Sequence, residues 1–264
     1  MTHSTTGFDT HKRALDVPVI ILAGGLGTRL RSVVSDRPKP LATVGGRPFL
    51  EILFDQIEAS GGREVVLATG YMGDAIESRF GRVRGSLRLE YARENQPLGT
   101  GGAARLAIER IDNDRMIMLN GDSFIDINLC DFSAKSKVQG YELMISVTDV
   151  NDSSGMGTIE IDLEGRIISF REKEGVRRPG RVNAGAYVVS RSLIETIPRE
   201  RFVSLERECF PEWISRGAGV YRTNSPLVDV GVPESFAAAN ESPPIVGRFW
   251  NRAEEILDIQ HQGV

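Results

Sequence analysis

The sequence predicts an α/β fold: a mixed, mostly parallel sheet flanked by helices, with a small β-rich subregion in the second half. In the first half, short continuous apolar runs, which are typical of buried parallel strands, alternate with segments of helical periodicity. In the second half, strand patterns follow one another with few helices between them. A chain of 264 residues is long enough to bury the core of such a domain.

The expected elements of the first half follow one another in α/β order. The run Val19-Ile20-Ile21-Leu22 predicts the first strand, and it leads directly into a glycine-rich segment. From Pro48 on, apolar residues recur at helical spacing until Gly61-Gly62, where the helix is expected to end. Strands are then expected at 64–69, 87–91 and 116–119, and helices at 74–80 and 100–110.

The second half is expected to extend the sheet and to add a smaller, lid-like subregion. Strands are predicted at 142–147, 158–161, 167–170 and 186–189, and Asp162-Leu163-Glu164-Gly165 predicts a hairpin turn. A helix is predicted around 206–216, where Pro211 is expected to disturb it. A last strand reaches Asp229, and helices are expected at 233–240, with proline in the first turn, and at 251–260.

These elements predict one domain over residues 18–245, between a mobile tail at 1–17 and a C-terminal tail at 246–264 that includes the last helix. No hexapeptide repeat follows the domain, which excludes an appended β-helix. The polar N-terminus lacks the apolar stretch of a secretory signal, and no apolar run approaches the ~20 residues needed to cross a bilayer. The net charge of −4 argues against nucleic acid or a membrane surface as the main partner.

The counts of cysteine and histidine exclude several mechanisms. Cys130 and Cys209 are far apart, so a disulfide scaffold or a cysteine-rich zinc site is not expected, and a reducing cytoplasm is the expected location. The histidines are His3, His11 and His261, all in the terminal segments. A Ser-His-Asp triad, a Cys-His dyad or a histidine-ligated zinc in the core is therefore excluded.

The segment Gly24-Gly25-Leu26-Gly27-Thr28-Arg29 directly follows the first predicted strand. Glycines at such a place let the backbone approach a ligand and direct N–H groups at an anion. The spacing is neither the dinucleotide fingerprint nor a Walker A loop, and a tight connection between two elements is the alternative interpretation. Arg29, with its planar guanidinium, and Lys39, set between two prolines, favour phosphate binding.

Five more polar residues stand where a site is expected. Asp122 follows a predicted strand and Asp229 ends another, and two carboxylates that meet at this edge of a sheet would hold Mg²⁺. For either Asp alone a turn is the favoured interpretation, and the metal site is expected because the two occur together with Arg29 and Lys39. Glu172 would accept hydrogen bonds from a polyol and Lys173 would hold a second phosphate, the alternative being a solvated strand end. Asn183 would bond a sugar hydroxyl or the backbone.

Taken together, the motifs resemble the signature of the sugar nucleotidyltransferases, the nucleoside-diphosphate-sugar pyrophosphorylases. The resemblance covers about residues 19–240 and implies a Rossmann-like nucleotidyltransferase domain. The motifs that carry it are, in order, Leu22-Ala23-Gly24-Gly25-Leu26-Gly27-Thr28-Arg29-Leu30, Pro38-Lys39-Pro40, Pro97-Leu98-Gly99-Thr100-Gly101-Gly102, Asn120-Gly121-Asp122, Glu172-Lys173, Asn183-Ala184-Gly185 and Asp229-Val230-Gly231-Val232-Pro233-Glu234.

Within that family, Arg31-Ser32-Val33-Val34, Arg37-Pro38-Lys39-Pro40-Leu41-Ala42 and Phe202-Val203-Ser204-Leu205-Glu206 make the chain similar to the heptose 1-phosphate guanylyltransferase branch. The resemblance implies that GTP and D-glycero-α-D-manno-heptose 1-phosphate give GDP-heptose and pyrophosphate, with Mg²⁺, for a bacterial capsule, S-layer glycan or lipopolysaccharide. Mannose 1-phosphate with GTP, glucose 1-phosphate with CTP or UTP, and a non-catalytic regulatory subunit of the same fold stay open. So does a homodimer.

The resemblance also implies roles for individual residues, although Met156 stands where the family often has tyrosine. Arg29, Lys39, Lys173 and Asp122 would be catalytic, Asp122 and Asp229 would bind the metal, and Gly157, Glu172, Lys173 and Asn183 would bind the sugar phosphate. The nucleotide would contact Leu22, Ala23, Gly24, Gly25, Gly27, Thr28, Arg29, Lys39, Glu94, Gln96, Gly99 and Thr100.

Overall fold

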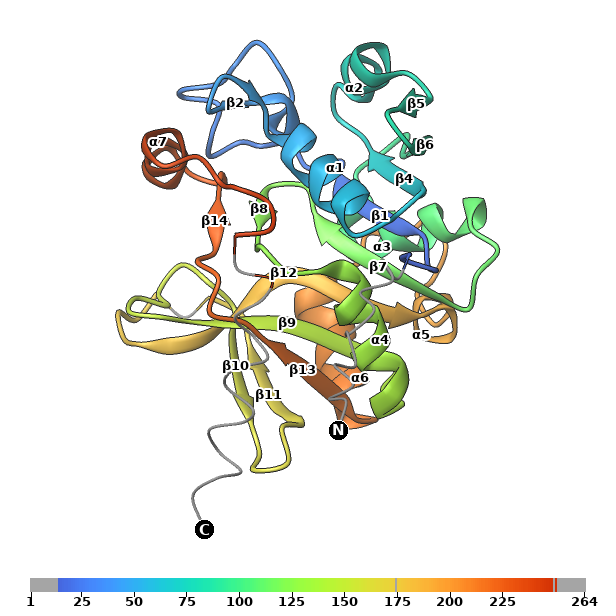
Figure 1. The fold of residues 1–264 in the computed structure, drawn as a ribbon, viewed down its shortest axis with the longest axis vertical. Coiled ribbons are helices and arrows are strands. Elements are labelled where there is room, and N and C mark those ends of the chain that lie inside the picture. The colour runs from blue at the N-terminus through green and yellow to red at the C-terminus, as the bar shows by residue number, and fades with distance from the viewer. Residues whose placement is uncertain (1–13, 174, 249, 251–264) are drawn as a thin grey trace, which may run out of the picture.

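A ten-stranded mixed sheet organises the chain (Figure 1), of which the computed structural model describes residues 14–173, 175–248 and 250. Its parallel part is formed by β7 (Arg115–Asn120), β1 (Val19–Ala23), β4 (Glu64–Thr69) and β6 (Leu87–Arg93), in this spatial order. The short β5 (Val83–Arg84) closes that edge by antiparallel pairing with β6. The predicted α/β class with a largely parallel sheet is confirmed.

The strands of the second half extend the sheet on the other side of β7. The long strand β12 (Gly180–Ser190) pairs antiparallel with β7, with β9 (Leu143–Val150) and with β10 (Thr158–Ile161). β10 forms the predicted hairpin with β11 (Ile167–Arg171), and these two strands make the β-rich subregion. β13 (Ala218–Arg222) adds to β9 in parallel.

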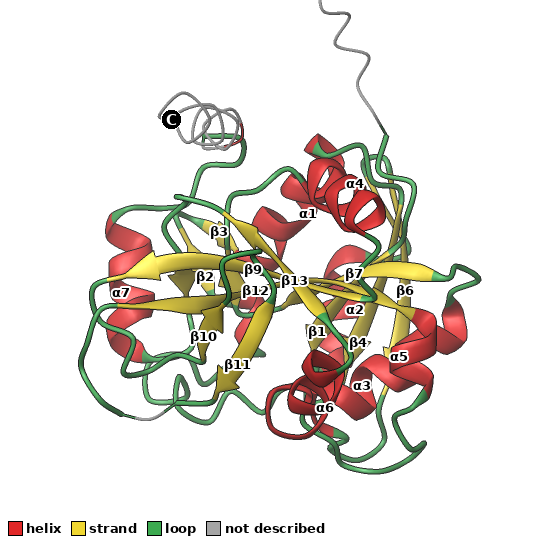
Figure 2. Cartoon of the chain, turned by 90° about the horizontal axis from the view of Figure 1, so that it is seen from below, coloured by secondary structure: helices red, strands yellow, loops and turns green. Residues whose placement is uncertain are grey.

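Helices cover both faces of the sheet (Figure 2). Successive residues of the central strands point to opposite faces, so each central strand contributes side chains to two cores. Ile21 contributes to one buried core and Ile20 to the other. The first core includes side chains of α1 (Phe49–Ala59), α2 (Gly73–Phe80), α4 (Leu129–Gln139) and α7 (Pro233–Glu241). The second includes side chains of α3 (Gly99–Ala107), α5 (Arg191–Glu195), η3 (Leu205–Cys209) and α6 (Phe210–Ser215).

The remaining elements are short. They are η1 (Lys39–Leu41), β2 (Thr43–Val44), β3 (Arg47–Pro48), η2 (Ile108–Arg110), β8 (Ser123–Phe124) and β14 (Val228–Asp229). β2 pairs with β3 and β14 pairs with β8, each as a two-stranded ribbon outside the main sheet.

Several elements were not predicted from the sequence, and one prediction was wrong in detail. The missed elements are α4, α5 and β13 and the short η1, β2, β3, β5 and β8. The helix expected around 206–216 is instead a π-helical turn, η3, continued by α6. Pro211 does not disturb a helix there, because it occupies the first turn of α6, where no N–H is required for the helical ladder.

The terminal predictions fall largely outside the described residues. Residues 1–13 of the expected N-terminal tail and the helix expected at 251–260 are not described. Leu15 is buried and Val17 packs against the same core, so these two residues of the expected tail belong to the packed domain. Within the described ranges, no helix has the length and apolar character needed to cross a membrane.

Candidate active site

A cavity of about 510 Å³ lies at the carboxyl ends of β1, β6 and β7, the edge of an α/β sheet where ligands bind. Its lining contains every residue predicted for the site except Gln96, which is exposed. The residues it brings together are Leu22, Ala23, Gly24, Gly25, Gly27, Thr28, Arg29, Lys39, Glu94, Gly99, Thr100, Asp122, Gly157, Glu172, Lys173, Asn183 and Asp229.

The glycine-rich segment leaves β1 as a loop that folds over Lys39. Gly27 has a φ of +61°, and a Cβ atom there would lie 3.2 Å from Cβ of Lys39. A Cβ atom on Gly24 would lie 2.9 Å from Oε1 of Glu94, so this glycine lets the loop pass the end of β6. The loop therefore joins the cationic part of the cavity to the part that contains Glu94.

Lys39 is held rigidly at the start of η1. Pro38 precedes η1 and Pro40 lies in its first turn, which restricts the backbone on both sides of the lysine. The Lys39 side chain is 10% exposed, and its Nζ lies 2.5 Å from Oδ2 of Asp122. This ion pair fixes a cation and a carboxylate side by side at the end of β7.

Asp122 and Asp229 are brought together by the β8–β14 ribbon. Asp229 is opposite Ser123, the residue that follows Asp122. Burial raises the pKa of Asp229, and the charge of Asp122 raises it further, while Lys39 lowers it. Gly231 donates its N–H to Oδ1 of Asp229 at 2.7 Å, so the carboxylate has a fixed orientation.

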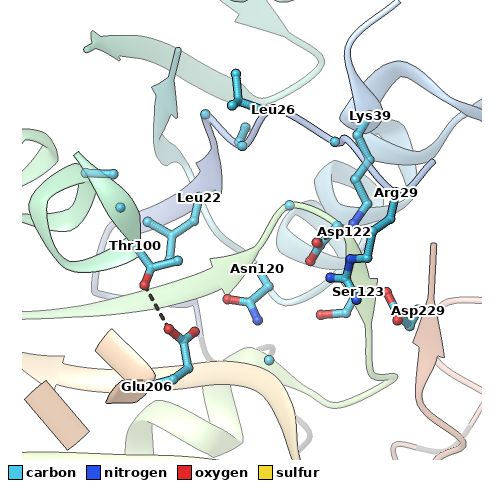
Figure 3. A pocket seen from close by; sticks show the side chains of 18 of the residues that line it. Leu22, Leu26, Arg29, Lys39, Thr100, Asn120, Asp122, Ser123, Glu206 and Asp229 are labelled. Atoms are coloured by element: carbon cyan, nitrogen blue, oxygen red, sulfur yellow. Dashed lines mark hydrogen bonds and ion pairs between the residues drawn. The ribbon is translucent and has the colours of Figure 1, made fainter. Parts of the chain in front are cut away.

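Two carboxylates form the kind of site that binds Mg²⁺, rather than one in which protein side chains supply all the metal ligands. Across the described part of the chain, no group of three or more His, Cys, Asp or Glu side chains is placed to hold a metal. Mg²⁺ is commonly bound by one or two carboxylates and completes its shell with water and phosphate oxygens. Asp122 and Asp229 supply oxygen donors of the required kind beside Arg29 and Lys39 (Figure 3).

A second polar group lies on the far side of the cavity, between β10, β11 and β12. Asn183 donates from Nδ2 to the Tyr187 hydroxyl at 2.8 Å, and its Oδ1 accepts from the N–H of Gly185 at 3.0 Å. Glu172 follows β11, and burial raises its pKa while the neighbouring Lys173 lowers it. Gly157 leaves room for Phe170 beside this group, because a Cβ atom there would lie 2.9 Å from Cζ of Phe170 and 3.4 Å from Oε2 of Glu172.

Glu94 stands at the end of β6, against the backbone of the glycine-rich loop. Its Oε2 accepts the N–H of Leu98 at 3.0 Å, and a Cβ atom on Gly70 would lie 2.4 Å from its Oε1. Burial raises the pKa of Glu94, whereas the hydrogen bond from Leu98 lowers it. The carboxylate is thus an oriented acceptor at the end of the cavity next to Gly24.

The lining also contains residues that the sequence interpretation did not assign to the site, among them Asn120, Ser123, Phe202 and Glu206. Oδ1 of Asn120 and Oγ of Ser123 are buried and have no hydrogen-bond partner within the described residues. Glu206 accepts a hydrogen bond from Thr100 at 2.9 Å (Figure 3). Asn120, Phe202 and Glu206 stood inside motifs quoted for the resemblance, which was the signal that could have identified them.

Comparisons with known proteins agree with this geometry. The profile of the Nucleotidyl transferase family matches residues 18–243. The chain is 33% identical over 217 residues to D-glycero-alpha-D-manno-heptose 1-phosphate guanylyltransferase of Campylobacter jejuni, an alignment that covers 82% of this chain and 96% of the relative. It is 34% identical over 224 residues to mannose-1-phosphate guanylyltransferase of Mycobacterium tuberculosis, covering 83% of this chain and 62% of that protein.

Solved structures give the same assignment at the level of the fold. HddC from Yersinia pseudotuberculosis superposes with a TM-score of 0.76 at 33% identity, covering 85% of this chain and 98% of the other. A structure of that protein complexed with GMP-PN matches equally well. The matches to the family profile and to full-length relatives confirm the resemblance found in the motifs, and the chain belongs to the nucleotidyl transferase family.

Proposed function

We propose that the chain is a sugar-1-phosphate guanylyltransferase that converts GTP and D-glycero-α-D-manno-heptose 1-phosphate into GDP-heptose and pyrophosphate. The observation that carries this proposal is that one cavity is lined both by the cations Arg29 and Lys39, the latter paired with Asp122, and by the hydrogen-bonding side chains Glu172 and Asn183. Relatives that align over nearly their whole length and carry the heptose 1-phosphate guanylyltransferase name support the choice of substrates.

The charges set the direction in which the substrates bind. Arg29 lines the cavity and, within the described ranges, has no ion-pair partner, so its guanidinium is available to phosphate oxygens. Lys39 lies nearby against Asp122. The triphosphate therefore belongs at this end, and the sugar hydroxyls belong at Glu172 and Asn183, whose oxygen atoms accept hydrogen bonds. Lys173 is placed to meet the phosphate of the sugar.

We infer an in-line attack of a sugar phosphate oxygen on the α-phosphorus of GTP, with pyrophosphate as the leaving group. A phosphate monoester has a second pKa of ~6, so at neutral pH the nucleophile is already largely dianionic and needs no general base. The barrier is the repulsion between two anions and the charge that develops on the leaving group. Arg29, Lys39 and Lys173 lower it by positioning and neutralising these charges, and no histidine is required.

Asp122 and Asp229 are the residues that would hold Mg²⁺. When bound, this ion would supply positive charge to the phosphate oxygens. The two carboxylates would also be compensated by it, which explains how Asp229 is tolerated beside Asp122 in a half-buried position.

The base is assigned from Glu94. Guanine presents N1–H and N2–H donors on one edge, and a carboxylate is an acceptor that complements such an edge. Oε1 of Glu94 has no partner in the described part of the chain, while Oε2 is fixed by Leu98. The relatives' names support the same choice. The chemistry belongs in the cytoplasm, in the synthesis of a bacterial surface polysaccharide.

Mannose 1-phosphate is the second candidate for the sugar. The similarity to the mycobacterial mannose-1-phosphate guanylyltransferase favours it, although the chain spans 62% of that protein. The two sugars differ only beyond the pyranose ring, so both would place the same ring hydroxyls at Glu172.

The test is pyrophosphate release from GTP, ATP, CTP and UTP, each with heptose, mannose and glucose 1-phosphate, with and without Mg²⁺. We expect the highest kcat/KM for GTP with the heptose 1-phosphate and none without the metal. Turnover with CTP or UTP in place of GTP would overturn the assignment of Glu94. No pyrophosphate release with any pair of substrates would favour a non-catalytic subunit of the same fold.

A further inference from the structure

Residues 201–206, here called the strap, pack against the start of α3. Backbone hydrogen bonds hold them there, and glycines in α3 allow the two backbones to approach closely. Gly101 donates its N–H to the Val203 carbonyl at 2.8 Å, and Val203 donates to the Leu98 carbonyl at 2.8 Å. Cβ atoms on Gly99 and Gly102 would lie 2.5 Å from the Val203 carbonyl oxygen and 2.6 Å from the Arg201 carbonyl oxygen. These positions therefore require glycine for the strap to pack against α3. This structural requirement is independent of any bound nucleotide.

The strap ends in an oriented carboxylate. Oε2 of Glu206 accepts hydrogen bonds from the hydroxyls of Thr100, at 2.9 Å, and Ser204, at 3.1 Å. The Thr100 hydroxyl in turn accepts the N–H of Leu205 at 2.9 Å, so its proton is directed at Glu206. No partner for Oε1 of Glu206 is found among the described residues, and the residue lines the cavity.

The surroundings of Glu206 identify the class of group that it can accept. Figure 3 shows its carboxylate next to Thr100 and Asn120, on the opposite side of the cavity from Arg29, Lys39 and the two aspartates. The charge of Glu206 also contributes to the raised pKa of Glu172, after the larger effect of burial, so the two carboxylates are close enough to interact. Two carboxylates repel phosphate, whereas they accept hydrogen bonds from hydroxyl groups.

We propose that Glu206 is a specificity-determining residue for the sugar: Thr100 and Ser204 hold Oε2, and Oε1 accepts a hydrogen bond from a hydroxyl group of the sugar 1-phosphate. This inference rests on the proposed function, because it assumes a sugar phosphate in the cavity. Thr100 then acts as a positioning residue toward the sugar, in addition to the nucleotide contact predicted from the sequence.

Steady-state kinetics of Glu206→Gln test the proposal, with mannose 1-phosphate and its monodeoxy analogues as probes. The amide keeps the size of the side chain and one acceptor but places a donor where Oε1 was. We expect KM for mannose 1-phosphate to rise about tenfold or more, with KM for GTP unchanged. The penalty should vanish for the one deoxy analogue that lacks the partner hydroxyl. An equal penalty for every analogue, or a change confined to GTP, would overturn the proposal.

Variants of Thr100 separate the positioning role from a structural one. Thr100→Val removes the hydroxyl while keeping the shape, and should raise KM for the sugar 1-phosphate in the same direction as Glu206→Gln. Thr100→Ser restores the hydroxyl and should restore KM. The matched control is Glu212→Gln on α6, an exposed glutamate outside the cavity, which should leave both KM values unchanged. Failure of the serine variant to restore KM would contradict the positioning role.

The failure of this inference can be distinguished from the failure of the proposed function. Absence of wild-type turnover with every nucleotide and sugar phosphate overturns the proposed function. In that case, isothermal titration calorimetry with mannose 1-phosphate still decides the role of Glu206. Weaker binding by Glu206→Gln than by the wild type supports it, and equal or absent binding in both proteins overturns it.

Discussion

The seat of the strap can be tested by adding one methyl group at Gly99. This residue has a φ of +70°, and its Cβ would lie 2.5 Å from the carbonyl oxygen of Val203. A left-handed conformation costs a non-glycine residue about 1–2 kcal/mol, and overpacking a filled site costs about 1–3 kcal/mol more. Gly99→Ala should therefore lower the free energy of unfolding by about 2–5 kcal/mol, a substantial part of the stability of an ordinary domain.

Gly140→Ala is the matched control for the cost of the left-handed backbone conformation. Gly140 has a φ of +72°, and no atom lies within 4 Å of the position of its Cβ. Its substitution should cost only about 1–2 kcal/mol. Urea unfolding of both variants gives the difference, which measures the contact with the strap. Equal losses for the two variants would refute the close approach of Gly99 to Val203.

The same substitution links stability to function. A methyl group at Gly99 must push the Val203 carbonyl away, and Glu206 lies three residues further along the strap. Gly99→Ala should therefore raise KM for the sugar 1-phosphate, whereas Gly140→Ala should not. An unchanged KM in a measurably destabilised Gly99→Ala would show that the strap does not position Glu206.

Three further predictions concern charged groups of the site. Asp122→Asn should lower turnover by about a hundredfold or more through loss of the metal, and near-normal rates across a Mg²⁺ titration would contradict this role. Lys173→Ala should mainly raise KM for the sugar phosphate in initial-rate assays, and an unchanged value would remove Lys173 from the site. Burial raises the pKa of Glu94, so the folded state binds this proton more tightly than the unfolded state does. The free energy of unfolding should therefore fall as pH rises above the ordinary pKa of a glutamate. Glu94→Gln should remove this fall, so that the urea midpoint of the variant rises relative to that of the wild type between pH 4 and pH 7. A constant difference would show that burial does not raise the pKa of Glu94.

Much of the fold was predictable because buried strands and helices have recognisable patterns of apolar residues in the sequence. The central strand β1 is a continuous apolar run, and its alternate residues Ile20 and Ile21 enter different cores. The start of α1 and its end before Gly61 were equally visible from helical spacing and glycine. These signals are local, so they do not depend on which other segments the element contacts.

The missed elements lack such local signals. α4 buries small and polar residues such as Ser133 and Ser136 beside Leu129 and Phe132, so its apolar periodicity is weak. It begins at Asn128, whose side chain accepts the N–H groups of Cys130 and Asp131, a cap that propensity alone does not reveal. β13 is a short strand whose identity depends on its pairing with β9.

The site was predictable where its residues follow strands and hidden where they depend on packing. Asp122 and Asp229 were expected together because strand ends share one edge of the sheet, and the β8–β14 ribbon joins them. Glu206 lies 106 residues from its partner Thr100, and only the strap brings the two into contact. The position of Gln96 outside the cavity depends on loop geometry for which the sequence gives no signal.

The most direct test of the central claim is a competition experiment followed by ³¹P NMR. The protein is mixed with Mg²⁺, equal concentrations of GTP, ATP, CTP and UTP, and equal concentrations of heptose 1-phosphate and mannose 1-phosphate. The nucleotide sugar that accumulates reports kcat/KM for every pair at once. We predict that GDP-heptose and pyrophosphate appear first. Accumulation of a different nucleotide sugar, or hydrolysis of nucleotide without a sugar product, would contradict the account.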